Sequence, residues 1–165
     1  MDAQFNDKQL AIAYDYWQEI RGLRTAPRRE ELNLRELGSL LPRFNLLDVT
    51  WEPLQFRHRL VGATYVEMMG RNVTGHLVDE ALYGEAAHEI FETLRLVAEE
   101  VRPYRRLARL DWHDRNWLLQ EAAELPLVDE DGRVNMILRV SAFTPTKDLD
   151  TPRLSFLPLT QTISV

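Results

Sequence analysis

The chain has 165 residues, of which 45% are hydrophobic and 28% charged, the composition of an ordinary soluble globular domain. It contains no cysteine, which excludes a disulfide framework, a cysteine-ligated zinc site, a thiolate nucleophile and a flavin–cysteinyl photoadduct. The formal net charge of −6 argues against a general affinity for nucleic acid. No basic and apolar leader is visible, and no apolar run approaches the roughly 20 residues that cross a bilayer. We therefore expect a cytoplasmic protein with no membrane span.

The N-terminal segment 8–23 is predicted to be an amphipathic helix, with Asp7 or the competing Asn6 as its N-cap and Gly22 at its end. Its apolar residues recur at spacings of three and four and so share one face. This face either folds back on the rest of the domain or pairs with a second copy of the chain in a homodimer. The candidate interface residues are Leu10, Tyr14, Trp17 and Ile20.

A charged linker over 24–31 and a short helix over 33–41 follow, and the pattern then changes to that of strands. Segments 43–51 and 54–62 are predicted to form an antiparallel hairpin around the turn at Glu52 and Pro53. Because side chains alternate along a strand, Phe56, His58 and Leu60 are expected to point together toward the helices.

The second half predicts a short helix over 63–70, a helical turn within 75–82 and a long helix over 84–101. Three strands follow, over 104–112, 117–128 and 133–143, and Pro126 is expected to end or bulge the middle one. The order favours an α+β fold, a five-stranded antiparallel sheet with helices on one face, plus the N-terminal helix. We assign 1–31 to the N-terminal helix and linker, 32–143 to the main domain and 144–165 to a tail that packs on its surface.

Three glycines mark corners of this fold. Gly62 fits a turn from strand to helix where a side chain would collide, Gly70 a helix C-cap, and Gly75 a turn. None of them belongs to a phosphate-binding loop, because no dinucleotide or P-loop pattern surrounds them.

The element order and these corners resemble the PAS domain, and in particular a group of short single-domain bacterial PAS-like proteins. The resemblance is carried by the run Arg59-Leu60-Val61-Gly62 and by the run from Gly70 to Gly75. Weaker matches, kept in order, are Trp17 with Gly22, Pro27 with Arg29, Leu41-Pro42, Asp48 and Pro126-Leu127. The resemblance implies a sensory or regulatory role, through a small ligand or a protein partner such as a histidine kinase. Fold alone does not settle function.

Apolar and aromatic side chains between helices and sheet are candidates for lining a pocket for a small apolar ligand. The same side chains equally describe a filled core. The pocket candidates are Phe56, His58, Leu60, Tyr65, Met68, Met69, Phe91, Leu94, Trp112 and Trp117.

The four histidines offer little metal chemistry, since no two of them have metal-ligand spacing on one element. His58 is expected either as a core residue bonded to a backbone carbonyl, the favoured hypothesis, or as a polar handle in a pocket. His88 on the long helix is expected to be partly exposed and not a heme ligand. His113 lies beside Asp111 and Asp114 in a stretch typical of a polar hairpin loop.

We therefore expect a stand-alone, non-catalytic regulatory module with no resident cofactor, whose output comes from another protein because the chain is short. One alternative is an adaptor with a filled core and no ligand. A less favoured alternative is a small enzyme using His58 or His113 as a base. A further cluster is either a charge-protected strand edge or a partner contact. That cluster is Arg102, Arg105, Arg106, Arg109 and Arg115.

Overall fold

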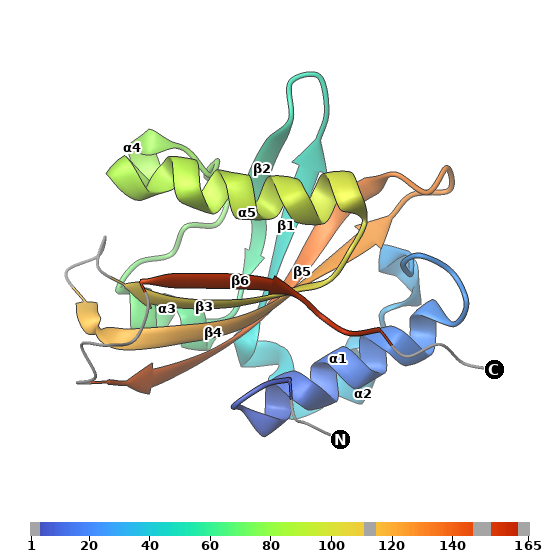
Figure 1. Cartoon of the computed structure of the whole chain (residues 1–165), viewed down its shortest axis with the longest axis horizontal. Helices are drawn as coiled ribbons and strands as arrows, with labels where there is room; N and C mark the ends of the chain where they lie inside the picture. The colour runs from blue at the N-terminus through green and yellow to red at the C-terminus, as the bar shows by residue number, and fades with distance from the viewer. Residues whose placement is uncertain (1–3, 111–114, 147–152, 162–165) are drawn as a thin grey trace.

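A computed structural model describes residues 4–110, 115–146 and 153–161 of the chain. Its centre is a six-stranded sheet with the order β2-β1-β5-β4-β3-β6, and every neighbouring pair is antiparallel (Figure 1). The α+β fold predicted from the sequence is thus confirmed, with one strand more than expected. The strands are β1 Phe44–Thr50, β2 Gln55–Val61, β3 Tyr104–Leu110, β4 Arg115–Val128, β5 Val134–Pro145 and β6 Leu154–Pro158.

Helices cover both faces of the sheet. The face that carries His58, here the front face, is covered by α3 (Ala63–Met69), α4 (Glu80–Tyr83) and α5 (Ala87–Glu100), and Phe91 of α5 packs edge-on against Phe56. The opposite back face is covered by α1 (Lys8–Arg21). Glu121 of β4 points to this back face and accepts hydrogen bonds from the backbone just before α1. Side chains alternate between the two faces along the central strands, and each face of the sheet is covered by its own helices.

Helix α1 begins where the sequence places it. The carboxylate of Asp7 accepts hydrogen bonds from the backbone N–H groups of Gln9 and Leu10, and Gly22 follows the last turn. The indole N–H of Trp17 donates to the carbonyl of Pro126 at 3.0 Å. The apolar face of the helix is thus occupied within this chain.

This packing corrects the predicted dimer anchors. Leu10, Tyr14 and Trp17 are buried against the chain's own sheet, and Ile20 is partly buried against the same core. A side chain that fills its own core has no surface left for a second copy. Ile12, on the outer face of α1, is the exposed large apolar residue of this helix.

A β-bulge in β2 corrects another prediction. Leu47 pairs with His58, whereas Leu46 pairs with Leu60, so Arg59 is an extra residue on β2. The bulge reverses the alternation beyond it. His58 and Phe56 therefore face the front as predicted, while Leu60 turns away and remains 43% exposed.

The two glycines that bound α3 act as the sequence indicates, by different physical means. A Cβ at Gly62 would lie 2.3 Å from the carbonyl oxygen of Pro42 and 2.7 Å from that of Phe44, so only glycine fits. Gly70 has a φ of 75° in the left-handed region and caps the end of α3.

The C-terminal segment contains a strand that the sequence does not predict. Strand β6 pairs with β3 from Tyr104 to Ala108, and the rings of Phe156 and Tyr104 stack with centroids 4.3 Å apart. Pro126 does not end β4, which stays paired with β5 through Val128. Strand β3 has its first paired residue opposite Glu124, so β4 needs no donor toward β3 at Pro126. The irregularity lies between Leu127 and Val128.

The remaining short helices differ in length from the prediction. Helix α2 covers only Leu34–Leu37 and continues as a 3₁₀ helix over Gly38–Arg43. The turn expected within 75–82 appears as α4, and 3₁₀ segments over Arg29–Glu31 and Gly84–Ala86 complete the described elements. Of the helices in the described part of the chain, none has the length and apolarity needed to cross a membrane.

Candidate functional site

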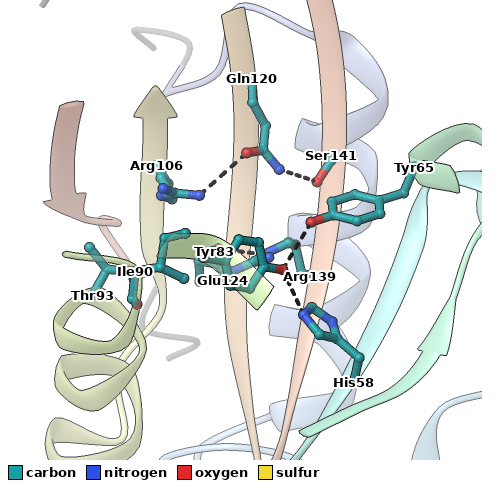
Figure 2. A network of polar contacts seen from close by, with 10 residues as sticks. All are labelled: His58, Tyr65, Tyr83, Ile90, Thr93, Arg106, Gln120, Glu124, Arg139 and Ser141. Atoms are coloured by element: carbon teal, nitrogen blue, oxygen red, sulfur yellow. Dashed lines mark hydrogen bonds and ion pairs between the residues drawn. The ribbon is translucent and has the colours of Figure 1, made fainter. Parts of the chain in front are cut away.

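A group of polar side chains is buried on the front face, between the sheet and helices α3 to α5. They come from four strands and two helices and point into the same interior region (Figure 2). We call this group the inner polar cluster. It consists of His58, Tyr65, Tyr83, Arg106, Gln120, Glu124, Arg139 and Ser141.

One side of the cluster joins β2 to the short helices. The Nε2 atom of His58 lies 2.7 Å from the hydroxyl oxygen of Tyr83, which lies 3.4 Å from the hydroxyl of Tyr65. Burial, with a further contribution from the positive charge of Arg139, lowers the pKa of His58 to about 3. Burial also raises the pKa of Tyr83 well above its ordinary value. Both side chains are therefore neutral at neutral pH.

The centre of the cluster is an ion pair across the two central strands. The Nε atom of Arg139 on β5 lies 2.7 Å from a carboxylate oxygen of Glu124 on β4. Burial opposes the charge on Arg139, but Glu124 and the two tyrosines hold its pKa above the ordinary value. Arg139 thus keeps its charge inside the protein.

The third part of the cluster lies toward β3. Arg106 donates to the amide oxygen of Gln120 at 3.3 Å, and Gln120 donates in turn to the hydroxyl of Ser141 at 3.1 Å. Arg106 is 3% exposed. Burial and the nearby charge of Arg139 lower its pKa.

Several buried polar atoms of the cluster have no hydrogen-bond partner within the protein. They are Nδ1 of His58, Nε of Arg106, Nη2 of Arg139 and Oε2 of Glu124. Buried polar groups normally find partners, so such a concentration on one face is characteristic of a site that bonds to water or to a ligand. The inner polar cluster is thus a candidate site for water or for a polar ligand.

The predicted pocket residues that the structure describes divide into three groups. Tyr65 and His58 belong to the inner polar cluster, and His58 bonds to a tyrosine hydroxyl instead of the backbone carbonyl favoured from the sequence. Trp117 is 48% exposed and Leu60 also faces solvent, so neither lines the interior. Trp112 lies outside the described residues. The others pack within apolar clusters: Phe56, Met68, Met69, Phe91 and Leu94.

The other sequence-derived sites are dispersed. His88 is exposed, as expected, and His113 lies outside the described residues. The predicted arginine cluster does not form one surface, because Arg105 pairs with Glu121 on the back face while Arg106 is buried on the front. Within the described part of the chain, no group of three or more histidine, aspartate or glutamate residues is placed to hold a metal ion.

Sequence reasoning missed Tyr83, Gln120, Glu124, Arg139 and Ser141, and it assigned Arg106 to a surface. A signal for the central pair was present. Glu124 and Arg139 each interrupt an apolar strand, and the turn at 129–132 sets them directly opposite each other. Opposite charges at paired positions of a buried hairpin indicate an interior ion pair.

The chain matches one family model and is similar to a few solved structures. No curated protein matches the chain. Among solved structures, the crystal structure of a sensory box sensor histidine kinase from Vibrio cholerae is 15% identical, with 69% of this chain and 90% of that chain covered and a TM-score of 0.49. A family model described as a PAS domain matches residues 6–142, which contain the back-face helix, strands β1 to β4 and most of β5. The chain therefore belongs to the PAS domain family.

Proposed function

We propose that the protein is a non-catalytic sensory module that binds a small polar molecule at the inner polar cluster. Membership of the PAS domain family supports the sensory role. The ligand site is inferred from buried polar atoms that have no hydrogen-bond partner within the protein. These atoms belong to Arg106, Arg139, Glu124 and His58. A ligand that completes these hydrogen bonds binds strongly, because unpaired buried groups are costly.

The cluster offers a route from ligand to surface. Tyr65 and Tyr83 belong to α3 and α4, whereas their partner His58 belongs to the sheet. A ligand that competes with His58 for these hydroxyl groups favours a conformation in which the short helices are shifted relative to the sheet. The ligand raises the population of that conformation because it makes better contacts there. A partner protein, of the signalling class, reads the altered helix surface.

Catalysis is disfavoured by the chemistry of His58. A general base works best when its pKa lies near the working pH, and burial lowers the pKa of His58 to about 3. The imidazole is thus too weak a base to take a proton from a hydroxyl or water. It serves as a neutral hydrogen-bonding group.

A ligand-free adaptor is the second candidate function. It is favoured by the tight packing of the apolar residues beside the cluster, where the rings of Phe56 and Phe91 meet at 5.2 Å and Leu94 is fully buried. In this case water completes the inner polar cluster, and the protein acts only through its surface.

The test is native mass spectrometry of the purified protein, followed by analysis of the small molecules released on denaturation. We expect a stoichiometric extra mass in the wild type that is lost in Tyr83→Phe. The matched control is Tyr104→Phe, which removes a hydroxyl bonded to Glu100 outside the cluster and should keep the extra mass. A bare wild-type mass, with no melting shift in a screen of small polar compounds, would favour the adaptor.

A further inference from the structure

The buried charges on the front face do not balance. Among the described residues, the buried ionised groups on this face are Arg106, Arg139 and Glu124, which leaves one positive charge without a counterion. His58 and Tyr83 add none, since both are neutral. An uncompensated charge inside a protein is unfavourable by several kcal/mol, so a counterion is expected.

The unbalanced charge belongs to Arg106. Arg139 is hydrogen-bonded to the Glu124 carboxylate, whereas Arg106 hydrogen-bonds only to the neutral amide oxygen of Gln120, keeps a partnerless Nε atom and is attracted by Glu124 without direct contact. Arginine does not lose its proton in proteins, so burial alone does not remove this charge. A planar guanidinium with a partnerless donor is well suited to a carboxylate or a small inorganic anion.

Arg106 also borders a surface cleft. The cleft has a volume of about 20 Å³, close to that of one water molecule. The carboxylate of Glu89 at this cleft is already paired with Arg153, so it does not neutralise Arg106. The cleft is lined by the start of α5 and by β3 and β6: Ala86, Glu89, Ile90, Arg106, Ala108, Arg109, Arg153 and Leu154.

We infer that Arg106 binds one singly charged anionic group, either a small inorganic anion or the carboxylate of a small organic acid, an assignment that rests on the ligand site proposed above. The single positive excess sets the charge of this group, and the cleft sets its size. The partnerless Nη2 atom of Arg139 supplies a further donor within the same cluster. The ligand of the sensor is thus an anion and not an apolar molecule.

The test measures the melting temperature after exhaustive dialysis into a buffer free of small anions. Sodium chloride, sodium formate and sodium acetate are then added separately, to wild type, Arg106→Gln and the control Arg95→Gln. Arg95 is a surface arginine on α5 with salt bridges to Glu92 and Glu99. We expect wild type and control to gain roughly 5 °C at about a hundredfold excess over Kd, and Arg106→Gln to gain only the general salt effect.

The three salts separate the sources of the negative charge. A gain in chloride assigns the site to an inorganic anion, and a gain only in formate or acetate assigns it to an organic acid. Equal gains in wild type and Arg106→Gln would overturn the assignment. If Arg106→Gln does not fold, the chloride-35 NMR line width is measured with the wild type alone. Broadening of the chloride line that added formate reverses would support the inference. No broadening together with no shift in melting temperature would overturn it.

The outcomes also separate this inference from the proposed function. The wild type could release a neutral ligand and show no change in melting temperature with anions. That result would contradict the anion site and still support the sensory module. An anion response with no organic ligand recovered would keep the site of Arg106, with an inorganic anion as its occupant, and would remove only an organic small molecule as the ligand of the proposed function.

Discussion

Arg139 and Glu124 meet across the two central strands with a separation of 2.7 Å, and their side chains are 2% and 0% exposed. Both side chains lie in the fully buried part of the sheet, among apolar neighbours such as Leu125 and Val140. Removing two charges from water is unfavourable unless they pair closely, and here the pair also anchors the inner polar cluster. The ion pair is therefore better explained as specifying the interior arrangement than as adding stability.

Breaking this pair from one side should be severe. Arg139→Met leaves the Glu124 carboxylate buried without its partner, and we expect a loss of about 3–5 kcal/mol in the free energy of unfolding. The double variant Glu124→Leu with Arg139→Met removes both charges and should recover most of that loss. Urea denaturation measures both values. Arg95→Met, at the surface, should leave the unfolding curve unchanged, and a double variant as unstable as the single one would contradict this account.

Much of the fold could be predicted from residue patterns. The periodicity from Leu10 to Trp17 predicted α1, and the runs between Pro103 and the turn at 129–132, and after that turn, predicted β3, β4 and β5 within about three residues of their observed ends. Helix α1 has one strongly apolar face, which fixes its period, whereas β4 and β5 are buried on both faces and are marked by their length and bounding turns. Strand β6 was missed because its five residues include no clear alternation and its burial is only partial.

The site was harder to predict because it depends on contacts between distant segments. Leu60 was placed on the wrong face because a bulge cannot be seen in an alternating pattern. Arg106 was taken for a surface residue because buried arginines are rare, and the sequence does not show that α5 covers it. Tyr83 reaches His58 only after α4 folds over the sheet, a contact between residues 25 positions apart.

The corner at Gly62 should tolerate no side chain. Gly62→Ala would bring a methyl group within 2.3 Å of a backbone carbonyl, which must move to make room. We expect about 1–3 kcal/mol of destabilisation, the usual effect of overpacking. Thermal unfolding measures it, with Ala63→Gly at the exposed next position as the comparison. A melting temperature for Gly62→Ala that equals or exceeds that of the wild type would show that the corner is less tight than described.

Trp17 should stabilise the monomer and not a dimer. Trp17→Phe keeps an aromatic ring but removes the N–H that donates to Pro126, leaving a buried carbonyl unpaired. We expect a loss of about 1–3 kcal/mol, since an unsatisfied buried acceptor carries the full cost of desolvation. The urea midpoint of wild type and variant should not change over a hundredfold range of protein concentration. A midpoint that rises with concentration only in wild type would return Trp17 to a dimer interface.

The buried imidazole of His58 predicts an acid-sensitive fold. Burial lowers its pKa from about 6.5 to about 3, so between these values the unfolded chain binds a proton that the folded chain does not. Stability associated with His58 is therefore complete above pH 6.5 and is lost as the pH falls toward 3. The slope is about 1.4 kcal/mol per pH unit at its steepest.

His58→Gln should flatten this dependence while keeping a polar group near Tyr83. Urea unfolding at intervals from pH 7.5 to about 4.5 gives the free energy of unfolding for each protein, and other titrating groups cancel in the difference between wild type and variant. The control is His88→Gln, because His88 is exposed on α5 and should not alter the slope. Parallel curves for wild type and His58→Gln would mean that His58 accepts a proton in the folded protein, and hence that its surroundings admit water or an anion when the cluster is acidified.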